Sequence, residues 1–229
     1  MCFSATASFT AGAALIALGA TTLTKAARRS EAAFATIPLL FGTQQTIEGV
    51  IWLTFSHHAP GLQHVMIYVY SIFSHVLWPI YVPFAFRQME PAPGRRRAML
   101  WFQGAGVAVG GYLLYFLIKG PLGADVIGHH IVYQSPKFYL PPVMVLYLAS
   151  TCFTGFLSSH VFVRVFGVLS LTSAIATYVV FTAAMVSVWC FFAAILSVFI
   201  DFHLRRRGMA DPHPRIDARA VDAIAASLS

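Results

Sequence analysis

The chain has 229 residues, of which 58% are hydrophobic and only 10% are charged, and its mean hydropathy is +0.73. A soluble domain carries roughly 25% charged residues, so most of the surface of this protein is expected to face lipid. The net charge of +7 could suit nucleic acid, but the positions of the basic residues indicate membrane topology, and we expect no nucleic-acid partner.

Seven apolar stretches are long enough to cross the hydrocarbon layer, which is about 30 Å thick. Backbone amides in lipid must be satisfied within their own segment, so we expect an all-α, integral membrane bundle. Val161 to His203 is nearly unbroken and too long for one crossing, and we expect it to fold back near 181–183. The expected spans are 6–24, 33–55, 63–86, 98–118, 139–157, 161–180 and 183–203.

The basic residues assign an orientation to these spans. Thirteen of the 15 Lys and Arg residues fall in the first, third and fifth loops and after the last span, and only Lys119 and Lys137 fall on the other side. Cytoplasmic loops are enriched in Lys and Arg. The pattern therefore predicts seven crossings, an outer N-terminus, a cytoplasmic C-terminus and a location in a bacterial inner membrane.

The segments outside the spans carry further expectations. Residues 1–203 are predicted to form the transmembrane domain and residues 204–229 a basic cytoplasmic tail, whose last part, 214–229, has the spacing of a short amphipathic helix. The loop 119–138 is long enough to dip back over the bundle or to form a short interfacial helix. Gly106 and Gly110 have a small-xxx-small spacing, which favours close helix packing inside the monomer over a dimer contact.

The second span contains an ionisable residue. Gln44, Glu48 and Trp52 recur every four residues and share one helical face, and Gln45 flanks that face. A carboxylate near the bilayer centre costs about 2.5–3.5 kcal/mol on insertion scales. Glu48 is therefore expected to face the bundle interior and to be either paired or protonated.

The third span supplies a candidate partner for Glu48. Ser71, His75 and Trp78 share a face, and the short connection between the spans predicts antiparallel neighbours. Glu48 and His75 should then lie at similar depth, as a hydrogen-bonded pair, a proton relay or two metal ligands. Pro79 lacks an N–H and is expected to free the carbonyl of His75 one turn back.

Four short strings resemble those of a family of bacterial multi-pass membrane proteins of unknown function. They are Met1-Cys2-Phe3-Ser4-Ala5, Gln44-Gln45-Thr-Ile-Glu48-Gly49-Val-Ile-Trp52, Trp78-Pro79-Ile-Tyr81-Val-Pro83 and His130-Ile-Val-Tyr133. The resemblance covers the chain to about His203. It implies no activity, but it draws attention to Cys2, Glu48, His75 and His130.

Three hypotheses follow for the function. The first is a site that binds a metal ion (zinc, copper or iron) or a small ligand from the outer side. Such a site would serve an enzyme if one coordination position of the metal stays open for water. The second is a proton-coupled transporter or a sensor that uses Glu48 and His75. The third is a structural or assembly role, in which Glu48 only joins two helices.

The candidate residues and partners divide as follows. Cys152 and Cys190 are expected to be small buried residues, and Asp201 an anchor at the membrane interface. Besides lipid, two kinds of partner are expected. One is a small ligand or a metal ion, and the other is a second copy of this chain or a signalling protein. The ligand or proton-relay candidates are Gln44, Gln45, Glu48, His75, Trp78 and Tyr133, and the metal candidates are Cys2, Glu48, His75 and His130.

Overall fold

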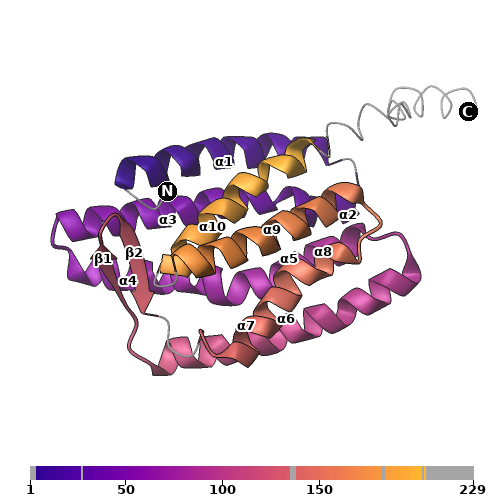
Figure 1. The fold of residues 1–229 in the computed structure, drawn as a ribbon. Helices are drawn as coiled ribbons and strands as arrows, with labels where there is room; N and C mark the ends of the chain where they lie inside the picture. The colour runs from indigo at the N-terminus through magenta and orange to yellow at the C-terminus, as the bar shows by residue number, and fades with distance from the viewer. Residues whose placement is uncertain (1–3, 27, 135–137, 182–183, 203, 205–229) are drawn as a thin grey trace, which may run out of the picture.

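The computed structural model describes residues 4–26, 28–134, 138–181, 184–202 and 204, most of which are helical. The helices run alongside one another in a bundle with a small β-hairpin at one end (Figure 1). In chain order the elements are α1 (Ala5–Lys25), α2 (Arg29–Ala35), α3 (Ile37–Ser56), α4 (Pro60–Ser71), the π-helix η1 (Ile72–Leu77), α5 (Trp78–Met89), α6 (Pro93–Lys119), β1 (Gly123–Ile127), β2 (His130–Gln134), α7 (Pro141–Leu148), the π-helix η2 (Ala149–Phe153), α8 (Thr154–Phe156), α9 (Val161–Val180) and α10 (Met185–Leu196).

Five helices in the described part of the chain are long and apolar enough to cross a membrane. They are Ala5–Lys25, Pro60–Met89, Pro93–Lys119, Val161–Val180 and Met185–Phe202. The apolar stretch Pro141–Phe156 is shorter. α3 does not belong to this set, because two glutamines and a glutamate lower its hydropathy. The predicted mostly helical architecture with apolar helices of membrane-spanning length is thus confirmed.

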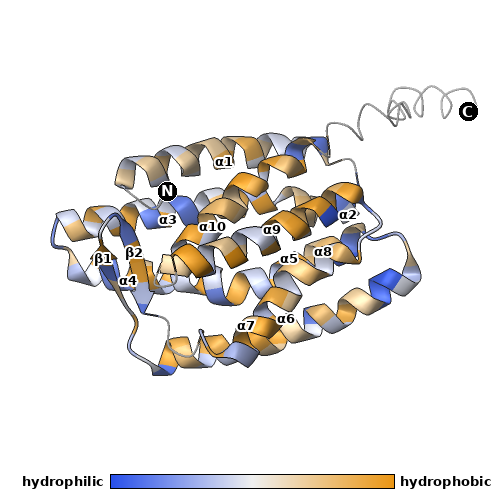
Figure 2. Cartoon of the chain, viewed as in Figure 1, coloured by the Kyte–Doolittle hydropathy of each residue, from blue (hydrophilic) through white to orange (hydrophobic). Residues whose placement is uncertain are grey.

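The bundle has two chemically different ends. Between them the helix surfaces are largely apolar, whereas hydrophilic residues gather near the ends (Figure 2). One end, here called the hairpin end, carries β1 and β2. The other, here called the basic end, carries Lys25 at the end of α1 and the run of arginines, 95–97, near the start of α6.

Several helix boundaries follow from local sequence. The Ser4 side chain accepts a hydrogen bond of 3.2 Å from the backbone N–H of Ala7 and caps α1. Proline lies in the first turn of α3, α4, α6 and α7, where its missing N–H leaves no helical hydrogen bond unmade. The predicted fold-back in the final apolar stretch is confirmed, since α9 ends at Val180 and α10 begins at Met185.

The structure corrects one expectation about continuity and decides between the two alternatives for a loop. The predicted second span, 33–55, is interrupted at Thr36, where α2 ends and α3 begins. The loop 119–138 contains no interfacial helix among its described residues. It returns over the bundle as an antiparallel hairpin in which Ile127 pairs with His130, and the intervening turn uses Gly128 at φ +63°, a backbone conformation that suits glycine.

Glycines allow the closest helix contacts. A Cβ atom on Gly19 of α1 would lie 2.5 Å from the backbone nitrogen of Leu39 in α3, so the two helices touch through their backbones. In α6, a Cβ on Gly106 would lie 1.8 Å from the carbonyl oxygen of Pro79, and one on Gly110 would lie 3.2 Å from Ile80. The predicted packing role of Gly106 and Gly110 inside the monomer is confirmed.

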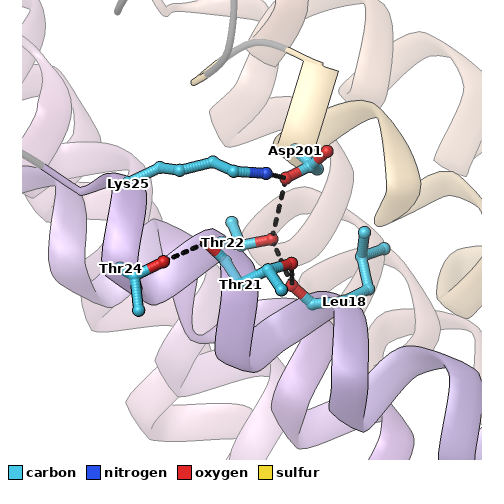
Figure 3. Close-up of polar contacts among 6 residues, drawn as sticks. All are labelled: Leu18, Thr21, Thr22, Thr24, Lys25 and Asp201. Carbon is cyan, nitrogen blue, oxygen red and sulfur yellow. Dashed lines mark hydrogen bonds and ion pairs between the residues drawn. The ribbon is translucent and has the colours of Figure 1, made fainter.

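The first and last helical stretches are joined at the basic end. Lys25 Nζ lies 2.6 Å from Asp201 Oδ1, and Thr22 Oγ1 donates to the same oxygen at 3.4 Å (Figure 3). Thr22 also donates to the carbonyl of Leu18 at 2.6 Å. Asp201 was predicted to anchor the chain at the interface, and the structure gives it a partner within the protein.

A second polar contact at the basic end joins the loop after α5 to the segment before α9. The Glu90 carboxylate accepts hydrogen bonds from Ser159 N at 2.7 Å, from Ser159 Oγ at 2.5 Å and from Ala92 N at 3.1 Å. Burial opposes ionisation of Glu90, but these hydrogen bonds and the nearby His160 hold its pKa below the usual value. At the basic end, the contact therefore fixes the last turn of α5 relative to the first turn of α9.

Candidate polar site

Glu48 lies on α3 in the half of the bundle nearer the hairpin end, and its side chain is fully buried. Its Oε1 atom accepts a hydrogen bond of 2.6 Å from Ser187 Oγ of α10 and one of 3.4 Å from the Tyr133 hydroxyl of β2. Three elements that are far apart in the sequence therefore meet at one carboxyl group. The prediction that Glu48 faces the interior is confirmed.

The hairpin covers this carboxyl group. Ile131 and Tyr133 of β2 are buried, whereas β1 residues near the turn are exposed. The Tyr133 ring stacks on Tyr70 of α4, with ring centroids 4.3 Å apart and an interplanar angle of 6°. A stacked aromatic pair of this kind contributes about 0.5–1.5 kcal/mol beyond its buried area. The stacking therefore stabilises the position of Tyr133 next to Glu48.

His75 is also fully buried, in the π-helix η1. Its Nδ1 atom lies 2.7 Å from Ser74 Oγ and 3.2 Å from the carbonyl oxygen of Ser71. A carbonyl can only accept, so this contact requires a proton on Nδ1, and in the neutral form of the ring Nε2 is then an acceptor. The ring packs edge-on against Phe138 at 4.8 Å.

The chain around His75 departs from α-helical geometry because of Pro79. In η1 the N–H of Trp78 bonds to the carbonyl of Phe73, five residues back. The next residue in this register is Pro79, which has no N–H to offer Ser74. The Tyr147 hydroxyl of α7 donates to the Ser74 carbonyl instead. The freed carbonyl is thus that of Ser74, and not that of His75 as predicted, because the π-helical register shifts it by one residue.

Gln44 and Trp78 connect α3 to α5 directly. Trp78 Nε1 donates a hydrogen bond of 2.7 Å to Gln44 Oε1, and both side chains are buried. The Trp78 ring also stacks on Phe41, one turn earlier on α3, at a centroid distance of 3.9 Å. These contacts confirm that the second and third apolar segments are neighbours at this depth.

The structure does not bring Glu48 and His75 into direct contact. Every described hydrogen bond of His75 goes to Ser71 or Ser74 on its own helical segment, and Glu48 bonds to Ser187 and Tyr133. The hydrogen-bonded pair, one of the three arrangements expected for these residues, is therefore wrong, and a proton relay that uses both of them stays a prediction. The π-helical turn gives His75 nearby acceptors of its own, and α10 and the hairpin occupy the space around the carboxyl group.

Several buried polar atoms of α3, α4 and η1 have no hydrogen-bond partner within the described residues. They are both amide atoms of Gln45, Ser71 Oγ and His75 Nε2, and all three side chains are at most 1% exposed. A buried polar group without a partner costs about 1–3 kcal/mol. An ordered water or a polar ligand would remove this cost at each of these atoms.

The predicted metal ligands do not form a group. In the part of the chain that the structure describes, no three His, Cys, Asp or Glu side chains lie close enough to hold one metal ion. His130 lies at the start of β2 and packs against Phe181 at 5.2 Å, and burial together with the neighbouring His129 lowers its pKa. Cys2 lies outside the described residues, so metal binding stays a prediction.

Sequence reasoning missed three residues that complete the site. Ser187 of α10 donates a hydrogen bond to Glu48, Tyr70 stacks on Tyr133, and the Tyr147 hydroxyl bonds to the freed carbonyl of Ser74. A signal for the two tyrosines exists, because a tyrosine deep in a span needs a partner for its hydroxyl.

Comparison with known proteins yields one relationship. No curated protein and no solved structure is similar to the chain. A family model described as a family of unknown function, DUF6629, matches residues 1–215, which confirms the resemblance to an uncharacterised family. The match extends over nearly the whole chain and includes every element of the polar site, and the protein therefore belongs to the DUF6629 family.

Proposed function

We propose that this protein is an integral membrane protein with seven crossings whose interior polar site binds a small polar ligand together with a proton at Glu48. The helices form seven stretches in the order of the predicted spans, which supports the count. The observation that carries the functional proposal is the Glu48 carboxyl group, buried and hydrogen-bonded to hydroxyls of both α10 and the hairpin.

The orientation rests on the described basic residues. Lys25, Arg28 and Arg29 lie at or beside the end of α1, and the arginines 95–97 lie in the first turns of α6, all at the basic end. Lys119, at the far end of α6, lies at the hairpin end. The positive-inside rule then places the basic end in the cytoplasm of a bacterial inner membrane, and the hairpin outside.

Access from outside would pass the hairpin. Tyr133 is the hairpin side chain that reaches Glu48, so a ligand entering from this side must displace its hydroxyl or bind beside it. The unpartnered atoms of Gln45, Ser71 and His75 offer both donors and acceptors. This set suits a small, uncharged or zwitterionic, hydrogen-bonding molecule.

Glu48 suits a proton-coupled role for a physical reason. A carboxyl group inside a membrane is most stable when neutral and becomes ionised only when hydrogen bonds or a bound cationic group compensate it. Movement of the Tyr133 hydroxyl would change this balance, and the ligand and the proton would then bind with mutual dependence. In its neutral form His75 has Nε2 as an acceptor, which offers a second place for a proton.

Proton flux tests the proposal. The purified protein is reconstituted in liposomes that contain a pH-sensitive dye, and a membrane potential is imposed. We expect proton uptake above that of empty liposomes, with Glu48→Gln reducing it to the empty-liposome rate. Glu31→Gln, which changes another buried carboxyl group at the basic end, is the matched control and should keep the flux. Equal flux in wild type and Glu48→Gln would contradict a proton-coupled role.

A further inference from the structure

A cavity lies beside Cys190 of α10, about one helical turn beyond Ser187, which bonds to Glu48, on the side of the basic end. It has a volume of about 30 Å³, and its walls come from α3, α5, α7, η2, α9 and α10. Phe41, Trp78 and Phe166 form part of the wall, and the polar edge is supplied by Cys152, Ser170 and Cys190. None of the side chains that line it is charged.

The register of α10 connects this cavity to the polar site. Ser187 bonds to Glu48, Cys190 follows three residues later, and Ala193, after three more, lines the cavity. Residues at this spacing lie on one face of a helix, about 4.5 Å apart along its axis. The Cys190 thiol lines the cavity.

The polar edge of the cavity lacks a hydrogen-bond partner. Ser170 is 4% exposed, and its Oγ atom has no partner among the described residues, although its carbonyl accepts from Trp189 Nε1 at 3.1 Å. Thr151 Oγ1 donates to the carbonyl of Tyr147 and lies 3.6 Å from Cys152 Sγ, so it can still accept. A hydroxyl, two thiols and a second hydroxyl thus border the same space.

The size of the cavity limits its occupant. A water molecule needs about 10–15 Å³ of such volume and two to four polar partners, whereas a dry cavity that binds benzene measures about 150 Å³. The observed 30 Å³ therefore holds about two water molecules and excludes an organic ligand of ring size.

We infer that this cavity binds one or two water molecules that hydrogen-bond to Ser170 and Cys190 and conduct protons between Glu48 and the inner half of the bundle. The inference rests on the proposed proton-coupled function. Each water accepts one proton from the side of Glu48 and releases another toward Ser170, so no group is oxidised or reduced and no covalent product remains.

An apolar layer closes the route beyond the cavity. Phe34, Ile37, Phe86 and Ile200 pack together between the cavity and the basic end, each at most 1% exposed. Protons that reach Ser170 therefore cannot pass to the cytoplasm without a rearrangement of this layer. A cavity that ends at this layer suits a gated carrier rather than an open channel.

Filling the cavity tests the inference. Ala193→Leu places three additional carbons in the cavity, and Ser170→Ala removes a hydroxyl from its edge with little change of shape. The matched control is Thr172→Val, because Thr172 is exposed on α9 and its hydroxyl bonds to carbonyls of the same helix. The first readout is the infrared S–H stretching band of Cys190, identified by its loss in Cys190→Ser. The second is proton flux in liposomes.

We expect Ala193→Leu to move the S–H band to the position of a thiol without a hydrogen bond and to reduce flux at least tenfold. Ser170→Ala should reduce flux in the same direction, and Thr172→Val should leave band and flux as in the wild type. Wild-type flux or an unshifted band in Ala193→Leu overturns the inference, even where Glu48→Gln abolishes flux. Failure of the proposed proton-coupled function gives a different result, namely a proton flux that is the same in Glu48→Gln as in the wild type.

Discussion

Replacement of Gly106 by alanine is expected to destabilise the protein by about 1 kcal/mol, the net of a packing cost and a gain in helix propensity. The new Cβ would lie 1.8 Å from the carbonyl oxygen of Pro79 and 2.7 Å from its carbonyl carbon. Carbon and oxygen atoms normally stay at least about 3.3 Å apart, so α6 must move about 1.5 Å away from α5. Overpacking of this kind costs about 1–3 kcal/mol, and the better helix propensity of alanine returns about 1 kcal/mol.

Two other glycines of the same helix provide the controls. A Cβ on Gly104 or on Gly111 meets no atom within 4 Å, so Gly104→Ala and Gly111→Ala should be neutral or stabilise the protein by up to about 1 kcal/mol. The assay is reversible unfolding in mixed detergent micelles, followed by circular dichroism. If Gly106→Ala is as stable as Gly104→Ala, the direct backbone contact between α5 and α6 is refuted.

Three further substitutions test polar contacts. Lys25→Met removes the 2.6 Å ion pair with Asp201 and should reduce the free energy of unfolding by about 1 kcal/mol, since the pair is partly exposed, while Lys25→Arg should retain most of it. The lowered pKa of Glu90 predicts a stabilisation that is complete at neutral pH and is lost as the pH falls through the folded-state pKa. In Glu90→Gln the free energy of unfolding should therefore depend less on pH in the acidic range. Ser187→Ala removes the 2.6 Å hydrogen bond to Glu48 and should cost about 1–3 kcal/mol in the same unfolding assay, whereas an unchanged stability would refute that contact.

The helical stretches could be predicted because their physical cause is local. Each apolar run must satisfy its own backbone in lipid, and the breaks near 181–183 and at the prolines are visible in the sequence. The hairpin 123–134 was missed although it leaves a signal. Two runs of β-branched residues flank Gly128 and His129, a pattern typical of a two-residue hairpin turn.

The site was only partly predictable because its contacts are distant in sequence. The periodicity of Gln44 and Glu48 correctly indicates an inward face, and burial of His75 follows from its position in a span. The hydrogen bond between Glu48 and Ser187 joins residues 139 positions apart, and no local pattern encodes it. The donor that satisfies the carbonyl freed by Pro79 is the Tyr147 hydroxyl of another helix, and no local pattern around His75 indicates it.

The central claim is that Glu48 is a buried carboxyl group that exchanges a proton under the control of Tyr133. Infrared titration of the reconstituted protein, from acidic to alkaline pH, measures the carbonyl band of protonated carboxyl groups directly. The account predicts a titrating band that is absent in Glu48→Gln and is shifted in frequency in Tyr133→Phe. Identical titration spectra for the wild type and Glu48→Gln would contradict it.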